Sequence, residues 1–254
     1  MGGRLVALSR DASDLRVVGA FERHGHPALG RDAGELAGIG RLGVAVTADP
    51  AAILARDRVL IEFTAPEPTV AHVRLAAERG ARAVVGTTGL SAGQVDELRS
   101  LARSTAILFS PNMSVGVNLA FRVLATMARA LGDAYDVEIT EIHHRTKKDA
   151  PSGTAAKMAE VVAEALDRRL DQVGVYGRHG LVGERGPKEI GVHALRGGDV
   201  VGEHTVVFST LGERLELTHR AHSRDTFAHG ALRAARWVRT VPPGLYSMHD
   251  VLGL

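Results

Sequence analysis

The sequence predicts an α/β protein in which a parallel sheet covered by helices is followed by an open, mixed sheet. As far as residue 109, short apolar runs rich in β-branched residues alternate with segments of helical periodicity. Buried strands joined by helices are typical of a parallel sheet with helices on both faces. Beyond residue 131 the runs alternate apolar and polar side chains, as half-exposed strands do. We therefore expect one domain of residues 1–114 and 225–254, and a second of residues 115–224.

Local signals place the elements of the first domain. Apolar residues recur at helical spacing over Pro68–Gly80, and the final glycine ends that helix. Ser91 is a good N-cap for the next helix, which carries Leu98 on its apolar face. The opening residues MGGRLVAL read as the start of a helix. Four buried strands are expected at Leu15–Phe21, Arg58–Phe63, Ala83–Val85 and Thr105–Phe109.

The second half of the chain predicts one α+β unit and a closing helix. Period-two alternation predicts strands at Tyr135–Ile142, Ile190–Leu195, Val200–Ser209 and Arg214–Arg220. Apolar residues at helical spacing predict helices at Val117–Leu131, Thr154–Leu170 and Ala228–Val238. Residues 242–254 are expected to form an irregular tail.

Composition excludes several classes of protein. A net charge of +2 over 254 residues, with scattered arginines, gives no basic field for nucleic acid. Cysteine is absent, which excludes disulfides and thiolate chemistry. No signal peptide and no apolar run near 18 residues is found, so we expect a cytoplasmic protein that does not enter a membrane.

The run Glu141–Ala155 (EIHHRTKKDAPSGTA) is the most informative part of the sequence. His143 is a candidate proton donor near neutral pH, although a pair of surface histidines is the alternative for it and His144. Lys147 beside them can neutralise a carboxylate or stabilise developing charge, whereas alone it would suit a solvated turn. No third ligand stands at metal-binding spacing and the lysines would repel a cation, so no metal is expected.

The start of the predicted helix in this run is a candidate anion site. Free backbone N–H groups and the positive end of the helix dipole meet at Gly153 and Thr154, where a carboxylate or phosphate can bind. Plain capping by Ser152 or Thr154 is the alternative. Glu22 ends an apolar strand 20 residues after Gly2, which is the spacing of the acid that binds an adenosine ribose in dinucleotide folds. A glutamate after a strand is common, and no G-x-G-x-x-G motif precedes it.

Taken together, these motifs resemble the dihydrodipicolinate reductase family of lysine and diaminopimelate biosynthesis, over almost the whole chain. The resemblance rests on six segments: AFER (20–23), DAGELAG (32–38), GTTG (86–89), SPNMSVGVN (110–118), EIHHRTKKDAPSGTA (141–155) and VGEHTVVFSTLGERLELTHRAHSRDTFAHGA (201–231). It implies a Rossmann-like dinucleotide-binding domain, a substrate-binding and oligomerisation domain, and an NADH- or NADPH-dependent oxidoreductase. A small dicarboxylate is the implied substrate and a homotetramer, built through the second domain's sheets, the implied assembly.

The resemblance also implies roles for particular residues. His143 would protonate the substrate as hydride arrives, and Lys147 would be the catalytic lysine. His144, Gly153 and Thr154 would hold the substrate's carboxylates. Glu22 would bind the adenosine ribose, and Arg23 a 2′-phosphate. The nicotinamide side would be lined by Gly86, Thr87, Thr88, Ser110, Pro111, Asn112 and Met113.

Family members begin with a strand and a glycine-rich loop, and this sequence starts at the Met-Gly that ends the loop. We therefore expect a Rossmann-like domain whose first strand is missing, with two exposed strand edges and weaker nucleotide binding. The alternative function is a non-catalytic, oligomeric ligand-binding protein disabled by loss of the pyrophosphate loop. Titration with NADH and NADPH would separate the two.

Overall fold

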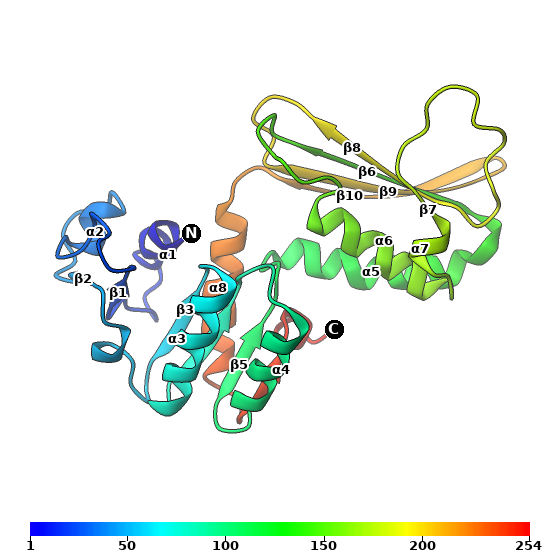
Figure 1. Cartoon of the computed structure of the whole chain (residues 1–254). Helices are drawn as coiled ribbons and strands as arrows, with labels where there is room; N and C mark the ends of the chain where they lie inside the picture. The colour runs from blue at the N-terminus through cyan, green and yellow to red at the C-terminus, as the bar shows by residue number, and fades with distance from the viewer. The chain divides into compact units, whose positions relative to one another are not determined.

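The structure, a computed structural model, describes residues 1–254 and divides into two compact units (Figure 1). Unit 1 consists of Met1–Val115 and Asp225–Leu254, and unit 2 of Gly116–Arg224. The chain therefore leaves the first unit, builds the second and returns. Each unit has its own sheet and its own apolar core.

Unit 1 is a layered α/β unit built on parallel strands. Its four-stranded sheet has the order β11-β5-β4-β3, and a separate two-stranded ladder pairs β1 with β2. Both β1 and β3 therefore have a paired strand on one side only. The strands are β1 (Ala20–Phe21), β2 (Val46–Thr47), β3 (Val59–Glu62), β4 (Arg82–Val85), β5 (Ala106–Phe109) and β11 (Gly244–Tyr246). The helical elements are α1 (Gly2–Ser9), α2 (Ala33–Leu36), η1 (Pro50–Ala52), α3 (Pro66–Glu78), α4 (Ala92–Leu101), α8 (Asp225–Val238) and α9 (Met248–Leu252).

Helices cover both faces of the four-stranded sheet, as the sequence predicted. Consecutive residues of β4, such as Val84 and Val85, point to opposite faces of the sheet and enter different cores. One core packs the sheet against α3 and α4, and the other packs it against α8, α9 and α1. Local signals set the ends of the helices as expected. Ser91 forms a capping box with Gln94 at the start of α4, and Gly80, at φ +70°, follows the end of α3.

Three predictions for individual elements are wrong in detail. The strand expected at Leu15–Phe21 is reduced to Ala20–Phe21, because β1 pairs only with the two residues of β2. The helix expected to reach Leu170 ends at Ala165, where Leu166 leaves helical geometry and Asp167 adopts φ +53°. The closing segment is not an irregular tail: β11 extends the sheet beside β5, and α9 packs through Met248 and Val251.

Unit 2 is an open sheet with helices on one face. The sheet has the order β10-β9-β6-β8-β7, in which β9 runs antiparallel to β6 and β10 while β8 runs parallel to β6 and β7. The mixed sheet predicted from the alternating runs is therefore present. Its strands are β6 (Asp136–His143), β7 (Gly174–Val175), β8 (Ile190–Arg196), β9 (Gly202–Thr210) and β10 (Glu213–Ala221). Its helical elements are α5 (Val115–Leu131), η2 (Gly132–Ala134), α6 (Gly153–Ala165) and α7 (Leu170–Val173).

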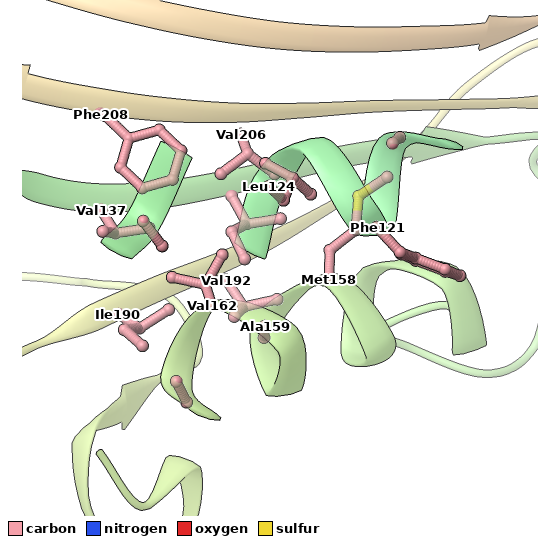
Figure 2. Packing of buried hydrophobic residues seen from close by; sticks show 14 of the residues in the cluster. Phe121, Leu124, Val137, Met158, Ala159, Val162, Ile190, Val192, Val206 and Phe208 are labelled. Carbon is pink, nitrogen blue, oxygen red and sulfur yellow. The ribbon is translucent and has the colours of Figure 1, made fainter. Parts of the chain in front are cut away.

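The core of unit 2 lies between the sheet and helices α5 and α6. Figure 2 shows Val137, Val206 and Phe208 of the strands facing Leu124 of α5 and Met158 of α6. One helical stretch, Val115–Ala134, has the length and apolar composition of a membrane-crossing helix, but core helices of soluble proteins often share both. In this structure its inward side chains belong to the core.

Candidate active site

The strand β6 presents Glu141 and His143 on one face. Two residues apart on a strand, they point the same way, toward the face that carries α6. Glu141 Oε2 lies 2.5 Å from His143 Nδ1. Because an ionised carboxylate can only accept a hydrogen bond, Nδ1 is the donor, and the other ring nitrogen, Nε2, is left for a ligand.

Glu141 is buried and its carboxylate is fully satisfied. Only 1% of the residue is exposed, and Arg196 at the end of β8 donates to both oxygens at 2.9 and 3.0 Å. The backbone N–H of Ser152 donates to Oε1 at 3.0 Å. Burial alone would raise the pKa of Glu141, but the hydrogen bonds from Arg196, His143 and Ser152 outweigh it and lower that pKa. The carboxylate is therefore held ionised beside the histidine.

The start of α6 lies beside this carboxylate. Ser152 is the N-cap, and its hydroxyl oxygen accepts from the backbone N–H of Ala155 at 3.2 Å. At Gly153, the first helical residue, an added Cβ would meet no atom within 4 Å. Open space beside the first turn of a helix is what an anion needs to approach it. The cap and the anion site, weighed as alternatives from the sequence, are therefore compatible.

His204 on β9 lies beside the start of α6 and contacts both Ser152 and His143. It is 4% exposed, its Nε2 lies 2.9 Å from Ser152 Oγ, and its ring packs edge-on against His143 with centroids 5.2 Å apart. Burial, followed by repulsion from His143, lowers the pKa of His204 to about 4. His204 is therefore neutral at pH 7.

The remaining residues of the histidine–lysine run lie on the turn after β6. The backbone N–H of Lys147 donates to His144 O at 3.1 Å, so the chain turns directly after the two histidines. Lys147 Nζ pairs with both oxygens of Asp149 at 2.8 Å, and only 18% of its side chain is exposed. His144 Nδ1 lies 2.8 Å from Thr146 Oγ1. The structure contains no group of three or more His, Asp or Glu side chains placed to hold a metal ion.

In unit 1, the candidate cofactor residues follow the carboxyl ends of parallel strands. Glu22 and Arg23 come directly after β1 and are exposed, with the Glu22 backbone N–H bound to Thr47 O. A carboxylate can accept hydrogen bonds from ribose hydroxyls and a guanidinium can bind a phosphate. This pair of side chains therefore fits a pyridine dinucleotide. The carboxyl edge of the strands is also where ligands bind in open α/β sheets.

The segment that follows β4 packs closely against Phe63, which follows β3. A Cβ at Gly86 would lie 2.2 Å from the ring of Phe63, so only glycine lets these two segments approach. Thr87 is buried, and its hydroxyl accepts from Thr64 N at 3.1 Å and bonds Thr69 Oγ1 at 2.8 Å. Thr88 is exposed. The hydroxyl of Thr87 thus joins two loops at this edge, and Thr88 is the threonine that faces solvent.

The segment after β5 also contains both buried and exposed residues. Ser110 donates its backbone N–H to Val85 O and its hydroxyl to Asn112 O, while Asn112 Oδ1 accepts from Ser114 N. Pro111 is exposed, whereas Met113 is 1% exposed and belongs to the core beside α8. Met113 therefore anchors the segment, and Pro111 and Asn112 are its more accessible residues.

Three residues of the candidate site had no role assigned from sequence. Glu141 could have been found, because alternation on a predicted strand places it on the same face as His143. His204 occupies an inward position of a predicted strand. Arg196 lies 55 residues beyond Glu141 and gives no local signal.

Comparisons with known proteins agree along the whole chain. The family model "Dihydrodipicolinate reductase, N-terminus" matches residues 1–113, and "Dihydrodipicolinate reductase, C-terminus" matches residues 116–252. A 4-hydroxy-tetrahydrodipicolinate reductase from Syntrophus aciditrophicus (strain SB) is 54% identical over 253 residues, which cover 100% of this chain and 94% of that protein. One of the same description from Citrifermentans bemidjiense is 51% identical over 254 residues, covering 100% and 95%.

A solved structure shares the fold. It is described as dipicolinate-bound dihydrodipicolinate reductase from Paenisporosarcina sp. TG-14, and it matches with a TM-score of 0.74 at 22% identity. The match covers 98% of this chain and 94% of that chain. The Rossmann-like unit and the mixed-sheet unit therefore both have folds that a solved structure contains.

Proposed function

The chain belongs to the dihydrodipicolinate reductase family, and we propose that it reduces 4-hydroxy-tetrahydrodipicolinate to tetrahydrodipicolinate in lysine and diaminopimelate biosynthesis. It is an oxidoreductase that uses NADH or NADPH. The reduced nicotinamide, when bound, supplies the hydride. The protein supplies binding, orientation and a proton.

The observation that carries this proposal is the proximity of a proton donor and an anion site on one strand–turn–helix segment. His143 keeps Nε2 available because Nδ1 is held by Glu141. The open space at Gly153 gives a carboxylate access to the N–H groups at the start of α6, and Thr154 follows in the same turn. Lys147 adds positive charge, and His144 a ring N–H, for the second carboxylate of a dicarboxylate substrate.

In the reaction, His143 gives the Nε2 proton to the substrate as the substrate accepts the hydride. The imidazolium then becomes the neutral ring that still donates from Nδ1 to Glu141. Lys147 stabilises negative charge that develops on the substrate. General acid catalysis of this kind works best when the donor's proton is available near the operating pH, which suits a histidine.

Unit 1 is the proposed cofactor-binding domain. Glu22 binds the adenosine ribose and Arg23 the 2′-phosphate of NADPH, while the segments after β4 and β5 line the nicotinamide side. The residues proposed there are Gly86, Thr87, Thr88, Ser110, Pro111, Asn112 and Met113. The engaged hydroxyl of Thr87 and the buried side chain of Met113 favour backbone contacts from these two residues.

Unit 2 is the proposed substrate-binding domain and the surface through which a homotetramer forms. The sheet face opposite α5 and α6 carries no helix (Figure 1). Ile142, Leu195 and Val207 lie on that face, and Leu195 is 49% exposed. Apolar side chains on an uncovered sheet face are buried most simply by the same face of a second copy. We propose a cytoplasmic enzyme.

The direct test follows the loss of reduced-nicotinamide absorbance when 4-hydroxy-tetrahydrodipicolinate is added with NADPH or NADH. Turnover that dipicolinate inhibits competitively supports the proposal, because a planar dicarboxylate should occupy the same site. No oxidation of either cofactor, under conditions where calorimetry shows that it binds, would rule the activity out. Sedimentation of the wild type and of Leu195→Asp tests the assembly, since a charge on the open face should dissociate a tetramer.

A further inference from the structure

Glu141 contacts the proposed acid in a way that fixes both the tautomer and the direction of the ring. The carboxylate takes Nδ1–H at 2.5 Å, and His204 supports the ring from the neighbouring strand. A histidine held through one nitrogen presents the other in one direction only. We propose that Glu141 is a positioning residue for His143 and that Arg196 in turn fixes Glu141; this inference rests on the function proposed above.

Arg196 explains why Glu141 can orient an acid without taking its proton. A lone carboxylate next to an imidazolium could accept the proton and leave both groups neutral. Here two guanidinium hydrogen bonds and the Ser152 N–H stabilise the ionised form. Arg196 is itself held, because it also donates to Asp149 O at 2.7 Å and to Leu195 O at 2.6 Å. Glu141 therefore stays ionised and the Nδ1 proton stays on the ring, so the Nε2 proton is the one that passes to the substrate.

The other titratable and charged groups near the His143 ring cannot take the place of Glu141 as the acceptor of the Nδ1 hydrogen bond. Arg196 from β8 is a cation, and His204 from β9 is neutral at pH 7. His219 on β10 lies opposite His204, and burial lowers the pKa of His219 as well. Lys147 from the turn is paired with Asp149. Glu141 is the carboxylate in contact with His143, so its removal leaves the ring beside neutral groups and cations.

The substitution Glu141→Gln tests the inference, because it keeps the shape and removes the charge. A glutamine amide can donate to Nδ1, which would move the proton of the neutral ring to Nε2. We expect the nitrogen chemical shifts of the His143 ring to report this change of tautomer. We also expect kcat to fall by about 10²-fold or more, as when the histidine-orienting acid of a catalytic triad becomes an amide. The KM for the dicarboxylate should stay near the wild-type value, and the alkaline limb of the kcat profile should move to lower pH.

Glu138→Gln is the matched control. Glu138 lies on the same strand and is paired with Arg178, Arg185 and His193, but it points to the opposite face of the sheet. The tautomer of His143 should not change in this variant. Arg196→Lys keeps one positive charge while losing the paired contact, so it should reduce kcat less than Glu141→Gln does.

Two results would overturn the inference. One is a Glu141→Gln protein with wild-type kcat. The other is lowered kcat with unchanged ring nitrogen shifts in a protein whose melting temperature has fallen, because that is a merely structural effect. The tautomer is measured without turnover, so a failure here differs from a failure of the proposed function, in which the wild type itself would not oxidise NADPH.

Discussion

The Nε2 atom of His143 lies over Gly202 of the neighbouring strand, 2.8 Å from where a Cβ atom would stand. Two more ring atoms, Cδ2 and Cε1, would be 3.3 and 3.5 Å from the same point. The backbone at Gly202 is ordinary extended strand, so the glycine is needed for space and not for a special conformation. The ring cannot simply rotate away, because Glu141 holds Nδ1.

Gly202→Ala should therefore displace the imidazole and reduce turnover while leaving the sheet intact. A shift of about 1 Å at a reacting group can cost about 10²-fold in rate, and we expect a loss of that order in kcat. Gly197→Ala is the control, because a Cβ there would meet only Ile142 Cδ1, at 4.0 Å. Steady-state kinetics and melting curves of both variants make the comparison. Equal kcat values would show that the ring has room to move.

His143→Ala and Lys147→Ala should each lower kcat far more than they weaken cofactor binding. Loss of a general acid typically costs about 10²- to 10⁴-fold in rate. The dissociation constant of NADPH, measured by calorimetry, should change little because neither residue belongs to unit 1. Lys148→Ala removes the adjacent, exposed lysine and should behave as the wild type. Near-normal turnover in His143→Ala would exclude it as the acid.

Arg23→Ala should weaken NADPH binding by about tenfold or more and leave NADH binding almost unchanged. A hydrogen bond to a charged group is typically worth about 1.5–3 kcal/mol, and the 2′-phosphate is the group that NADH lacks. The measurement is the ratio of the two dissociation constants. Arg41→Ala, at another exposed arginine of unit 1, provides the comparison. If Arg23→Ala leaves the ratio where it was, the phosphate is bound elsewhere.

Stability should fall as pH drops from about 6.5 toward 4, because of His204. Its pKa is about 4 in the folded protein and near 6.5 when unfolded, so in this window the unfolded chain binds a proton that the folded chain does not. The stabilising contribution is complete above pH 6.5 and is lost by about pH 4, and it amounts to roughly 3 kcal/mol. His219, whose pKa is also lowered by burial, adds to the loss in the same direction.

Urea unfolding at several pH values, for the wild type and His204→Gln, measures this dependence. The glutamine can still hydrogen-bond Ser152 but cannot take up a proton. The slope of unfolding free energy against pH should therefore be smaller in the variant. Parallel curves would mean that His204 is not the group responsible.

Local patterns predicted the fold well where an element's own residues decide it. Pro and Gly signals, apolar spacing and the Ser91 cap placed α3, the start of α4 and the strands β3, β4 and β5 within one or two residues. The prediction failed where partners distant in sequence decide. The length of β1 depends on the two residues of β2, and β11 exists because β5 offers it an edge.

The candidate site shows the same division. Residues 141–155 identified His143, Lys147 and the helix start, because those groups are neighbours in sequence, but their assigned roles stay predictions. Arg196 could not be found this way, since its importance comes from a register in which β8 lies beside β6 and pairs it with His143. Gly202 could not be found from the sequence for a different reason: it contributes by having no side chain where the His143 ring of the neighbouring strand lies.

The division of unit 1 into two chain segments has a consequence for the order in which the protein can fold during synthesis. The apolar face formed by Val84, Ala106 and Leu108 is covered mainly by α8 and α9, which are made after unit 2, while α1 contributes Leu5. While unit 2 is being translated, that face lacks α8 and α9, and exposed apolar surface of this kind favours aggregation. Unit 2 is one continuous segment and can close its core first, so Asp225–Leu254, which are made after it, complete the sheet that the first segment of unit 1 began.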